Sequence, residues 1–306
     1  MTAPRITVLL ATYNGRRWLP EQLDSILGQQ GVEVRVVALD DGSTDGTAEW
    51  LAERADADDR ITVLPHLGPS GSAAANFFRL LRLAGVDGAD YISLADQDDV
   101  WVPDKLARHA ALLREGAYDA ISSDITSFTA SGVRTLIRKS FPQRQFDYLT
   151  ESPGPGSTFL MTPRLVALVR EVLEADPRAG TAAYHDSLIY AIARARGWGW
   201  HIDSVSTVDY RQHDANVMGS NVGAGSALSR FNLVRTKWHR GQAVLHATVG
   251  LQLAPDEIRP GLERMLALMT SSSPAARLRL AAAAGSLRRR PRDRFIIGVL
   301  IALWIW

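Results

Sequence analysis

The first half of the chain alternates short apolar runs with longer segments whose apolar residues recur at helical spacing. Continuous apolar runs of this length predict strands buried in a parallel sheet. They lie at residues 6–11, 34–39, 61–64 and 91–95. Helices are predicted at 17–30, from a cap at Thr44 or Asp45 to 55, at about 72–84, and from Pro103 onward. This order predicts an α/β fold, a mostly parallel sheet with helices on both faces.

The pattern after residue 120 is more mixed and becomes helical towards the C-terminus. A strand is predicted at 120–123, a rigid turn at 153–156 leading into 157–161, helices at 164–173 and 186–196, and an edge strand at 201–208. From about residue 226 the spacing is helical. We therefore expect a sheet-bearing domain over 1–225 and a helical C-terminal extension over 226–306.

Composition narrows the class of protein. The chain has 306 residues, 46% of them hydrophobic and 22% charged, which is ordinary for a globular protein. A net charge of +1 gives no overall field that favours nucleic acid, so no nucleic-acid partner is expected. Without cysteine, disulfides and thiolate metal sites are excluded. Because the first residues lead straight into a strand without a signal-peptide pattern, we expect a cytoplasmic location.

Polar side chains follow three of the predicted strands at the point where each strand ends. They are Thr12-Tyr13-Asn14, Asp40-Asp41 and Asp96-Gln97-Asp98-Asp99. Ligands of parallel α/β sheets bind at the carboxyl ends of strands, so these three clusters predict one binding site. Neither a dinucleotide fingerprint nor a P-loop follows the first strand, which argues against an NAD enzyme or an NTPase.

The acidic tetrad is the most specific of the three clusters. Carboxylates this close repel one another unless a cation joins them. A hard divalent ion held by one or two carboxylates completes its coordination with substrate phosphates and water. The tetrad therefore predicts a metal–diphosphate site; the alternative is a solvated acidic loop that caps the following helix.

These residues, in this order, resemble a family-2 glycosyltransferase with the GT-A fold, over about residues 5–220. The segments at 11–14 and 39–47 are similar to the family's nucleotide-binding segments, and Asp96-Gln97-Asp98 is similar to its DXD metal motif. His185-Asp186 stands where the family carries its general base. The sequence at 95–101, together with Tyr210-Arg-Gln-His-Asp-Ala-Asn216, is most similar to a bacterial rhamnosyltransferase-like subgroup.

The resemblance implies an inverting, metal-dependent transfer of a sugar from a nucleoside diphosphate to a saccharide or lipid-linked acceptor, in cell-surface polysaccharide synthesis. It implies Asp186 as the base, although a helix N-cap is the alternative role for this residue. Asp98 would bind Mg²⁺ or Mn²⁺ directly, and Asp96 would bind the ion or the ribose. His213 is either a further metal ligand or a structural histidine.

The remaining candidate residues belong to the donor and the acceptor. Thr12, Tyr13, Asn14, and Asp40 or Asp41 would line the nucleobase pocket, with turn formation as a compatible role. Arg211 would pair with the diphosphate. Trp101, Gly156, Ser157 and His185 are assigned to the acceptor side, and Trp101 is alternatively a core residue.

Several functions stay open at the level of the sequence. The subgroup indicates dTDP-L-rhamnose as the donor, and the alternatives are UDP-galactofuranose or a UDP-hexose. A sugar-nucleotide binding protein without catalysis would need the strand-end clusters but not Asp186. A nucleotidyltransferase is disfavoured, because the loop after the first strand lacks the glycine-rich, basic character that holds a triphosphate.

The C-terminal tail is basic and apolar. Seven arginines follow residue 276, against one acidic residue, Asp293. The apolar run at 295–306 is too short to span a bilayer. It predicts a peripheral contact with the anionic inner face of the cell membrane, with the tryptophans of the tail at the interface. The alternative is a helix packed on the body or against a second subunit of a homodimer.

Overall fold

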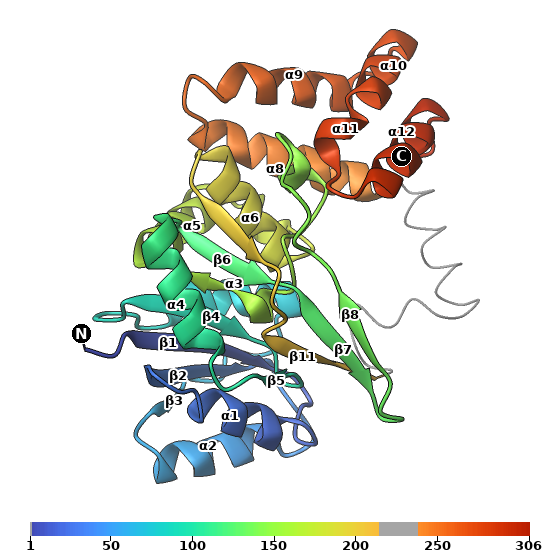
Figure 1. Cartoon of the computed structure of the whole chain (residues 1–306). Coiled ribbons are helices and arrows are strands. Elements are labelled where there is room, and N and C mark those ends of the chain that lie inside the picture. The colour runs from blue at the N-terminus through green and yellow to red at the C-terminus, as the bar shows by residue number, and fades with distance from the viewer. Residues whose placement is uncertain (1, 214–237) are drawn as a thin grey trace. The chain divides into compact units, whose positions relative to one another are not determined.

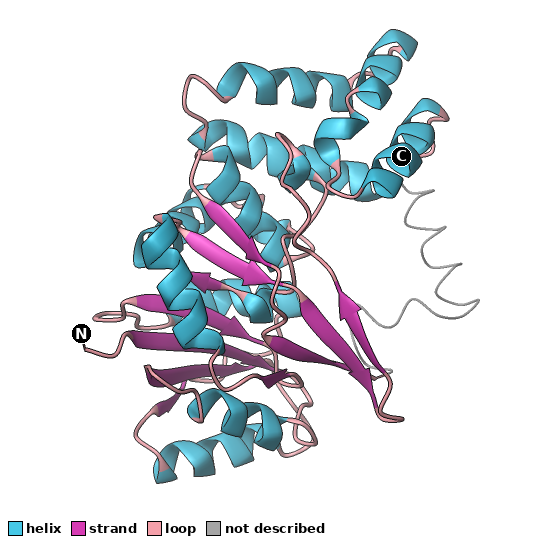
Figure 2. Ribbon diagram, viewed as in Figure 1, coloured by secondary structure: helices cyan, strands magenta, loops and turns pink. Residues whose placement is uncertain are grey.

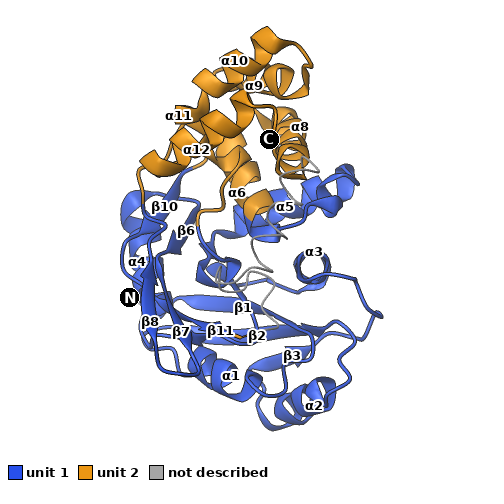
Figure 3. Cartoon of the chain, turned by 90° about the vertical axis from the view of Figure 1, so that its right-hand side faces the viewer, with its two compact units in different colours: residues 1–140, 154–186, 199–212 blue, residues 141–153, 187–198, 213–306 orange. Residues whose placement is uncertain are grey.

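The computed structural model describes residues 2–213 and 238–306, which form two compact units. The first unit comprises Met1–Ser140, Gly154–Asp186 and Gly199–Gln212, and the second comprises Phe141–Pro153, Ser187–Trp198 and His213–Trp306 (Figure 3). All the strands of the described residues lie in the first unit, and the described part of the second unit is helical. The expected domain boundary near residue 225 lies outside the described residues.

A seven-stranded sheet forms the centre of the first unit (Figure 2). In spatial order its strands are β10 (Trp200–Asp203), β6 (Ala120–Ser123), β9 (Leu160–Met161), β4 (Tyr91–Ala95), β1 (Arg5–Thr12), β2 (Glu33–Asp40) and β3 (Ile61–Val63). Neighbouring strands are parallel except around β9, which runs antiparallel to β4 and to β6. The predicted α/β fold with a mostly parallel sheet is confirmed.

Helices cover both faces of this sheet (Figure 1). On one face lie α1 (Leu19–Leu27), α2 (Thr47–Ala57) and α4 (Lys105–Gly116), whose buried leucines share a core cluster with Val8 and Leu10 of β1. The helices α3 (Ala73–Leu83) and α5 (Pro163–Ala175) pack on β1, β2 and β4 from the other face. Side chains along β1 point alternately to the two faces of the sheet, and both faces are covered by helices. Apolar residues are therefore needed on both sides of the strand, which is why it is a continuous apolar run in the sequence.

A second sheet of four strands lies beside the acidic loop. Its order is β5 (Val100–Trp101), β11 (Val208–Gln212), β7 (Ile125–Thr129) and β8 (Arg134–Ile137), with β11 parallel to β7 and the other pairs antiparallel. The single edge strand predicted at 201–208 is wrong: this segment divides between β10 and β11, which belong to different sheets. Asp203 ends β10, where its carboxylate accepts the N–H of Val205 and pairs with Arg108.

Short 3₁₀ helices complete the first unit at η2 (Gly156–Thr158) and η3 (Ala179–Thr181). The helix α6 (His185–Ala195) begins in the first unit and continues into the second. The second unit further contains η1 (Asp147–Leu149), α8 (Trp238–Leu253), α9 (Arg259–Thr270), α10 (Pro274–Ala282), α11 (Ala284–Leu287) and α12 (Pro291–Ala302). The expected helical extension is thus present over 238–306. Among the described helices, none has both the length and the apolar character needed to cross a membrane.

A buried ion cluster holds the second unit together. The Asp147 carboxylate has no solvent exposure, and it pairs with Arg194 at 3.2 Å and Arg289 at 3.4 Å while accepting the Tyr190 hydroxyl at 3.1 Å. Arg289 also pairs with Glu151 at 3.0 Å. Since removing one partner of a buried pair leaves the other charge uncompensated, Arg289 is a structural residue. Of the seven arginines in the tail, Arg289 therefore faces the interior of the second unit.

Candidate active site

The loop after β2 is organised by the buried carboxylate of Asp40. This group accepts the backbone N–H of Gly42 at 3.0 Å and of Ser43 at 2.8 Å. The hydroxyls of Ser43 and Thr12 donate to its second oxygen at 2.5 and 3.0 Å. Asp40 therefore shapes the turn that carries Asp41, as the turn interpretation of this motif expected. Asp41 in turn accepts from the backbone and the hydroxyl of Ser70.

Asn14 joins the loops that follow β1 and β2. Its backbone is left-handed, with φ of 49°, a conformation that asparagine tolerates better than most residues. Its side-chain oxygen accepts the N–H of Thr44 at 2.8 Å, and its own N–H donates to the Ser43 hydroxyl at 2.8 Å. The neighbouring Tyr13 side chain is 56% exposed. The two predicted nucleotide-binding segments thus form one surface, with the Tyr13 ring open to a ligand.

Gln97 connects the acidic loop to the same surface. Its amide donates to the carbonyl of Tyr13 at 2.8 Å and accepts the N–H of Tyr13 at 2.7 Å. A Cβ at Gly15 would lie 2.2 Å from the Gln97 Oε1 atom, so this close approach requires glycine. The sequence offered only an indirect signal for this link, an amide within an acidic run.

Two other carboxylates act electrostatically on Asp96, the first residue of the acidic loop. Burial, and then the charges of Asp98 and Asp186, raise the pKa of Asp96 to about 7. Neighbouring carboxylates disfavour one another's ionisation only at short range. Asp186, ninety residues away in the sequence, therefore lies within the field of the acidic loop in the first unit.

This arrangement fits a hard divalent cation. The donors are carboxylate oxygens. Burial is the first cause of the raised pKa of Asp96, and the negative charges of Asp98 and Asp186, which raise it further, are what a cation would neutralise. Within residues 2–213 and 238–306, no group of three His, Cys, Asp or Glu side chains is arranged to hold a metal by itself. Oxygens of a bound diphosphate and water would complete the coordination.

Asp99 is the last residue of this loop and ties it to two other segments. Its buried carboxylate accepts the Ser157 hydroxyl at 2.7 Å and the N–H of Arg211 at 3.3 Å. Burial, and then the charges of Asp98 and Asp96, raise the pKa of Asp99 well above its usual range. Asp99 and Ser157 are therefore positioning residues, and the Ser157 hydroxyl is engaged internally rather than offered to an acceptor.

A buried lysine, Lys105, lies within the electrostatic field of Asp99 and over the ring of Trp101. Lys105 is fully buried, its Nζ atom lies 3.3 Å from the centroid of the Trp101 ring, and it donates to the Ser93 hydroxyl at 3.2 Å. Burial lowers the pKa of Lys105 well below its ordinary value, opposed by the charge of Asp99. Trp101 is 3% exposed and belongs to the core cluster, so of its two expected roles burial supports the core role rather than the acceptor wall.

Arg211 places its guanidinium at the acidic loop. It donates to the Asp98 carbonyl at 2.9 Å and pairs with Glu21 at 2.5 Å, while the group lies 4.6 Å from the Phe128 ring. These contacts engage the Nε and Nη2 atoms, and they bring the positive charge of Arg211 to the acidic loop.

His185 precedes Asp186 at the start of α6 and is held by its surroundings. Its ring stacks on Phe77 with centroids 3.9 Å apart, and its Nε2 atom has no hydrogen-bond partner among the described residues. Burial lowers the pKa of His185 to about 4, so the ring is neutral at physiological pH. A Cβ on Gly156 would lie 2.3 Å from this Nε2 atom. The start of η2 and the start of α6 are therefore fitted to one another only because residue 156 is glycine.

Gly156→Ala is expected to disturb the site through this contact. The added methyl group must displace the His185 ring, which moves the start of α6 and Asp186 with it. Since a small misplacement near the reacting groups is costly, we expect kcat to fall roughly 100-fold with the donor KM nearly unchanged. Steady-state kinetics measure both constants. The matched control is Gly241→Ala, where an added Cβ meets nothing within 4 Å. Wild-type kinetics in Gly156→Ala would contradict the proposed coupling.

His213 lies in the second unit, at the end of the described segment, and residues 214–216 of its motif lie outside the described residues. Its expected role as a metal ligand therefore stays a prediction.

Comparison with known proteins identifies the family. The family model described as Glycosyl transferase family 2 matches residues 7–175. A dTDP-rhamnosyl transferase of Shigella flexneri, RfbG, is 35% identical over 233 residues, which cover 76% of this chain and 81% of that protein. The succinoglycan biosynthesis protein ExoO of Rhizobium meliloti is 34% identical over 108 residues, covering 34% of this chain and 28% of that protein.

Solved structures share the fold at low sequence identity. TarS of S. aureus, residues 1–349 in complex with UDP-GlcNAc, has a TM-score of 0.60 at 17% identity, covering 96% of this chain and 79% of that one. The mannosyltransferase PcManGT of Pyrobaculum calidifontis, in complex with GDP-Man and Mn²⁺, has a TM-score of 0.53 at 20% identity, covering 98% and 87%. The predicted GT-A fold is thus confirmed. The chain belongs to glycosyl transferase family 2, and it is an enzyme that uses a nucleotide sugar.

Proposed function

We propose that this enzyme transfers L-rhamnose from dTDP-rhamnose to a saccharide or lipid-linked acceptor, with inversion at the anomeric carbon, in the synthesis of a cell-surface polysaccharide. The observation that supports the transfer chemistry is that the charges of Asp98 and Asp186, in addition to burial, act on the carboxyl of Asp96. The similarity to RfbG, at 35% identity over most of both chains, supports the choice of donor.

Asp186 is proposed as the general base. The acceptor hydroxyl attacks the anomeric carbon on the face opposite the diphosphate, and the Asp186 carboxylate takes the hydroxyl proton as the bond forms. A role at the start of α6 alone does not require that the charge of Asp186 act on Asp96, as it does. The stacked, neutral ring of His185 holds the start of α6 and so orients the base.

Asp98 and Asp96 are proposed to hold Mg²⁺ or Mn²⁺, with Asp96 alternatively contacting the ribose and His213 as a further candidate ligand. When bound, such an ion supplies charge stabilisation for the departing diphosphate. The Arg211 guanidinium, placed at the Asp98 carbonyl, contributes to the same stabilisation through charge-assisted hydrogen bonds. The Mn²⁺ in the PcManGT complex supports this assignment.

The nucleobase is proposed to bind over the surface formed by the loops after β1 and β2. Tyr13 offers an exposed ring for stacking, and Thr12 and Asn14 hold the surface in place through Asp40 and Ser43. Asp40 or Asp41 is proposed to accept a hydrogen bond from the base. Asp40 already accepts four hydrogen bonds, so Asp41, which accepts two from Ser70, has the greater remaining capacity.

Competition between donors tests this proposal. A ligand that binds only the folded state raises the melting temperature, and about 2.7 kcal/mol of stabilisation is expected at one hundred times Kd. With Mn²⁺ present, we expect dTDP-rhamnose to raise the melting temperature more than UDP-galactofuranose or a UDP-hexose at equal concentration. Manganese alone serves as the control. A clear preference for a UDP-sugar would reject this donor while leaving the fold and the transfer chemistry in place.

We also propose that the enzyme works as a peripheral protein at the inner face of the cell membrane, since a lipid-linked acceptor would be presented there. The basic, apolar tail supports this placement. A homodimer formed through the tail is the alternative.

A further inference from the structure

The helix α12 has two apolar faces, and only one of them is packed. Ile297 and Ile301, four residues apart, are buried in the second unit. Phe295, Val299 and Leu303 follow the same spacing on the other side, where Phe295 is 74% and Leu303 is 63% exposed. A stripe of this kind on a surface helix leaves large apolar groups in water, which indicates a partner.

A neighbouring residue extends this stripe into a patch. Ile296, which is 46% exposed, adjoins it on α12. We call Phe295, Ile296, Val299 and Leu303 the apolar face. The helix α12 that carries it packs on α10 and α11, so the apolar face belongs to a packed helix rather than to a frayed end.

Exposed arginines accompany the apolar face. Arg279, Arg290 and Arg292 are exposed; the Arg292 side chain is 73% accessible and forms a surface pair with Asp293 at 3.3 Å. Asp293 is the one acidic residue of the sequence after residue 271. The other tail arginines are engaged within the unit: Arg289 in the ion cluster, for example, and Arg294 with the carbonyls of Arg288 and Arg289. The basic character of this surface therefore rests on a few outward guanidinium groups.

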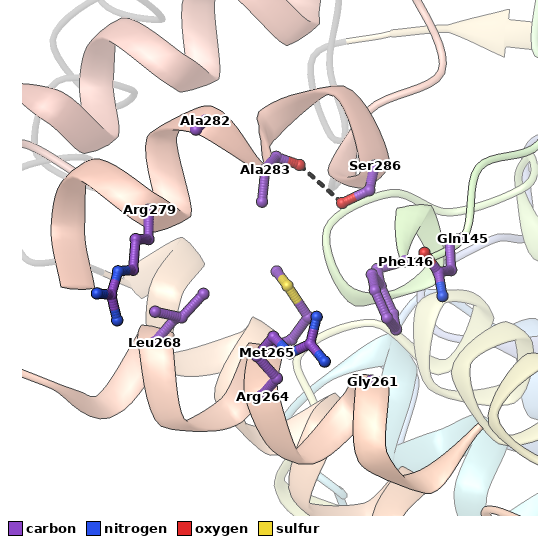
Figure 4. Close-up of a pocket in the computed structure, with 10 residues that line it drawn as sticks. All are labelled: Gln145, Phe146, Gly261, Arg264, Met265, Leu268, Arg279, Ala282, Ala283 and Ser286. Carbon is purple, nitrogen blue, oxygen red and sulfur yellow. Dashed lines mark hydrogen bonds between the residues drawn. The ribbon is translucent and has the colours of Figure 1, made fainter. Parts of the chain in front are cut away.

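A cavity of about 720 Å³ lies between α9, α10 and α11 (Figure 4). Phe146, Met265 and Leu268 are among its apolar lining residues, and Arg264 and Arg279 contribute two guanidinium groups. Arg279 is thus both an exposed arginine and part of the cavity lining. The cavity and the apolar face therefore both combine apolar side chains with nearby arginines.

We infer that the apolar face binds the surface of an anionic lipid bilayer, with α12 lying in the plane of the interface. Charge complementarity favours this occupant, since arginines beside an apolar helix face suit anionic headgroups. A second copy of the chain would bring the same arginines together across a two-fold axis, which is unfavourable. This inference rests on the proposed peripheral placement and assigns the surface that performs it.

The tryptophans of the tail are not part of this surface, contrary to the expectation that they sit at the interface. The Trp304 ring lies 5.4 Å from the Arg240 guanidinium and 5.0 Å from that of Arg277. Trp306 is buried. Both rings contribute to the packing of the C-terminal helices. Phe295 and Leu303 are therefore the side chains expected to insert into the membrane interface. Truncation of the tail would remove Arg289 and these rings together, so point variants are the appropriate test.

Co-sedimentation of the full chain with lipid vesicles tests the inference. With vesicles of phosphatidylglycerol and phosphatidylcholine, we expect F295S/L303S to lower the partition coefficient at least tenfold. R279Q/R292Q should lower it by about fivefold for each arginine and weaken its dependence on salt. The matched control is L83S/L136S, which removes two exposed leucines of the first unit and should bind as the wild type does. Thermal melts confirm that each variant is folded.

Three results would overturn the inference. The first is a wild-type protein that does not bind these vesicles, and the second is binding that F295S/L303S leaves unchanged. The third is a wild-type dimer in sedimentation equilibrium that F295S/L303S converts to a monomer, because a second copy would then cover the apolar face. Transfer to a soluble acceptor is measured separately and should be unchanged in F295S/L303S. Loss of transfer in every sample would count against the proposed function and not against this surface.

Discussion

Asp98→Asn is expected to abolish sugar transfer almost completely while the protein stays folded. The substitution keeps the shape of the side chain but removes a charge that a divalent cation needs. The charge of Asp98 also contributes to the raised pKa of Asp96, so its removal relieves repulsion in the metal-free protein. We therefore expect the metal-free variant to melt at or above the wild-type temperature, and the stabilisation by Mn²⁺ with nucleotide to disappear.

Thermal melts with and without Mn²⁺, together with transfer rates, check this result. The control is Asp59→Asn, which removes an exposed carboxylate of the same unit and should change neither quantity. Wild-type transfer by Asp98→Asn, or transfer that survives complete chelation, would refute the assignment of this loop to a cation.

Asp186→Asn is expected to slow transfer by roughly 10²–10⁴-fold, the usual contribution of a positioned proton acceptor. Donor affinity should stay close to that of the wild type, because the base acts on the acceptor hydroxyl and not on the nucleotide. Rates under donor saturation, combined with a direct measurement of donor binding, separate the two effects.

The same variant distinguishes catalysis from helix capping. Asparagine caps a helix about as well as aspartate, so a capping role predicts a folded and fully active Asp186→Asn. Asp186→Ala would then be destabilised by about 1 kcal/mol with its rate per folded molecule preserved. A folded Asp186→Asn variant with unaltered turnover would contradict the assignment of Asp186 as the general base.

The strands of the central sheet could be predicted because a strand that is buried on both faces has a continuous run of apolar residues. The strand predicted at 91–95 and the one at 120–123 agree with β4 and β6. The small sheet could not be predicted in this way. Its strand β8 is largely exposed and short, and β11 is defined by pairing with β7, about eighty residues away. Strand pairing over such a distance in the sequence produces no local periodicity of apolar and polar residues from which a strand could be predicted.

The candidate site shows the same division between local and distant information. The strand-end clusters were predictable because parallel strands bring their carboxyl ends to one edge. The contacts that fit them together were not: the Gln97 amide on Tyr13, the Ser157 hydroxyl on Asp99, and the Lys105 Nζ above Trp101. Each joins residues whose sequence neighbours give no hint of the partner. In the tail, likewise, the arginine run gave no sign that Arg289 is buried in an ion cluster.

The measurement that tests the central claim most directly follows the donor by NMR in the presence of a soluble saccharide acceptor. Wild type, Asp98→Asn and Asp186→Asn are compared with dTDP-rhamnose, with Mn²⁺ and after chelation. The claim predicts that the wild type consumes the donor only with the cation and joins the sugar with inverted anomeric configuration, while both variants leave the donor almost intact. Retained configuration, or equal turnover by the wild type and Asp186→Asn, would contradict an inverting transfer that depends on the acidic loop and Asp186.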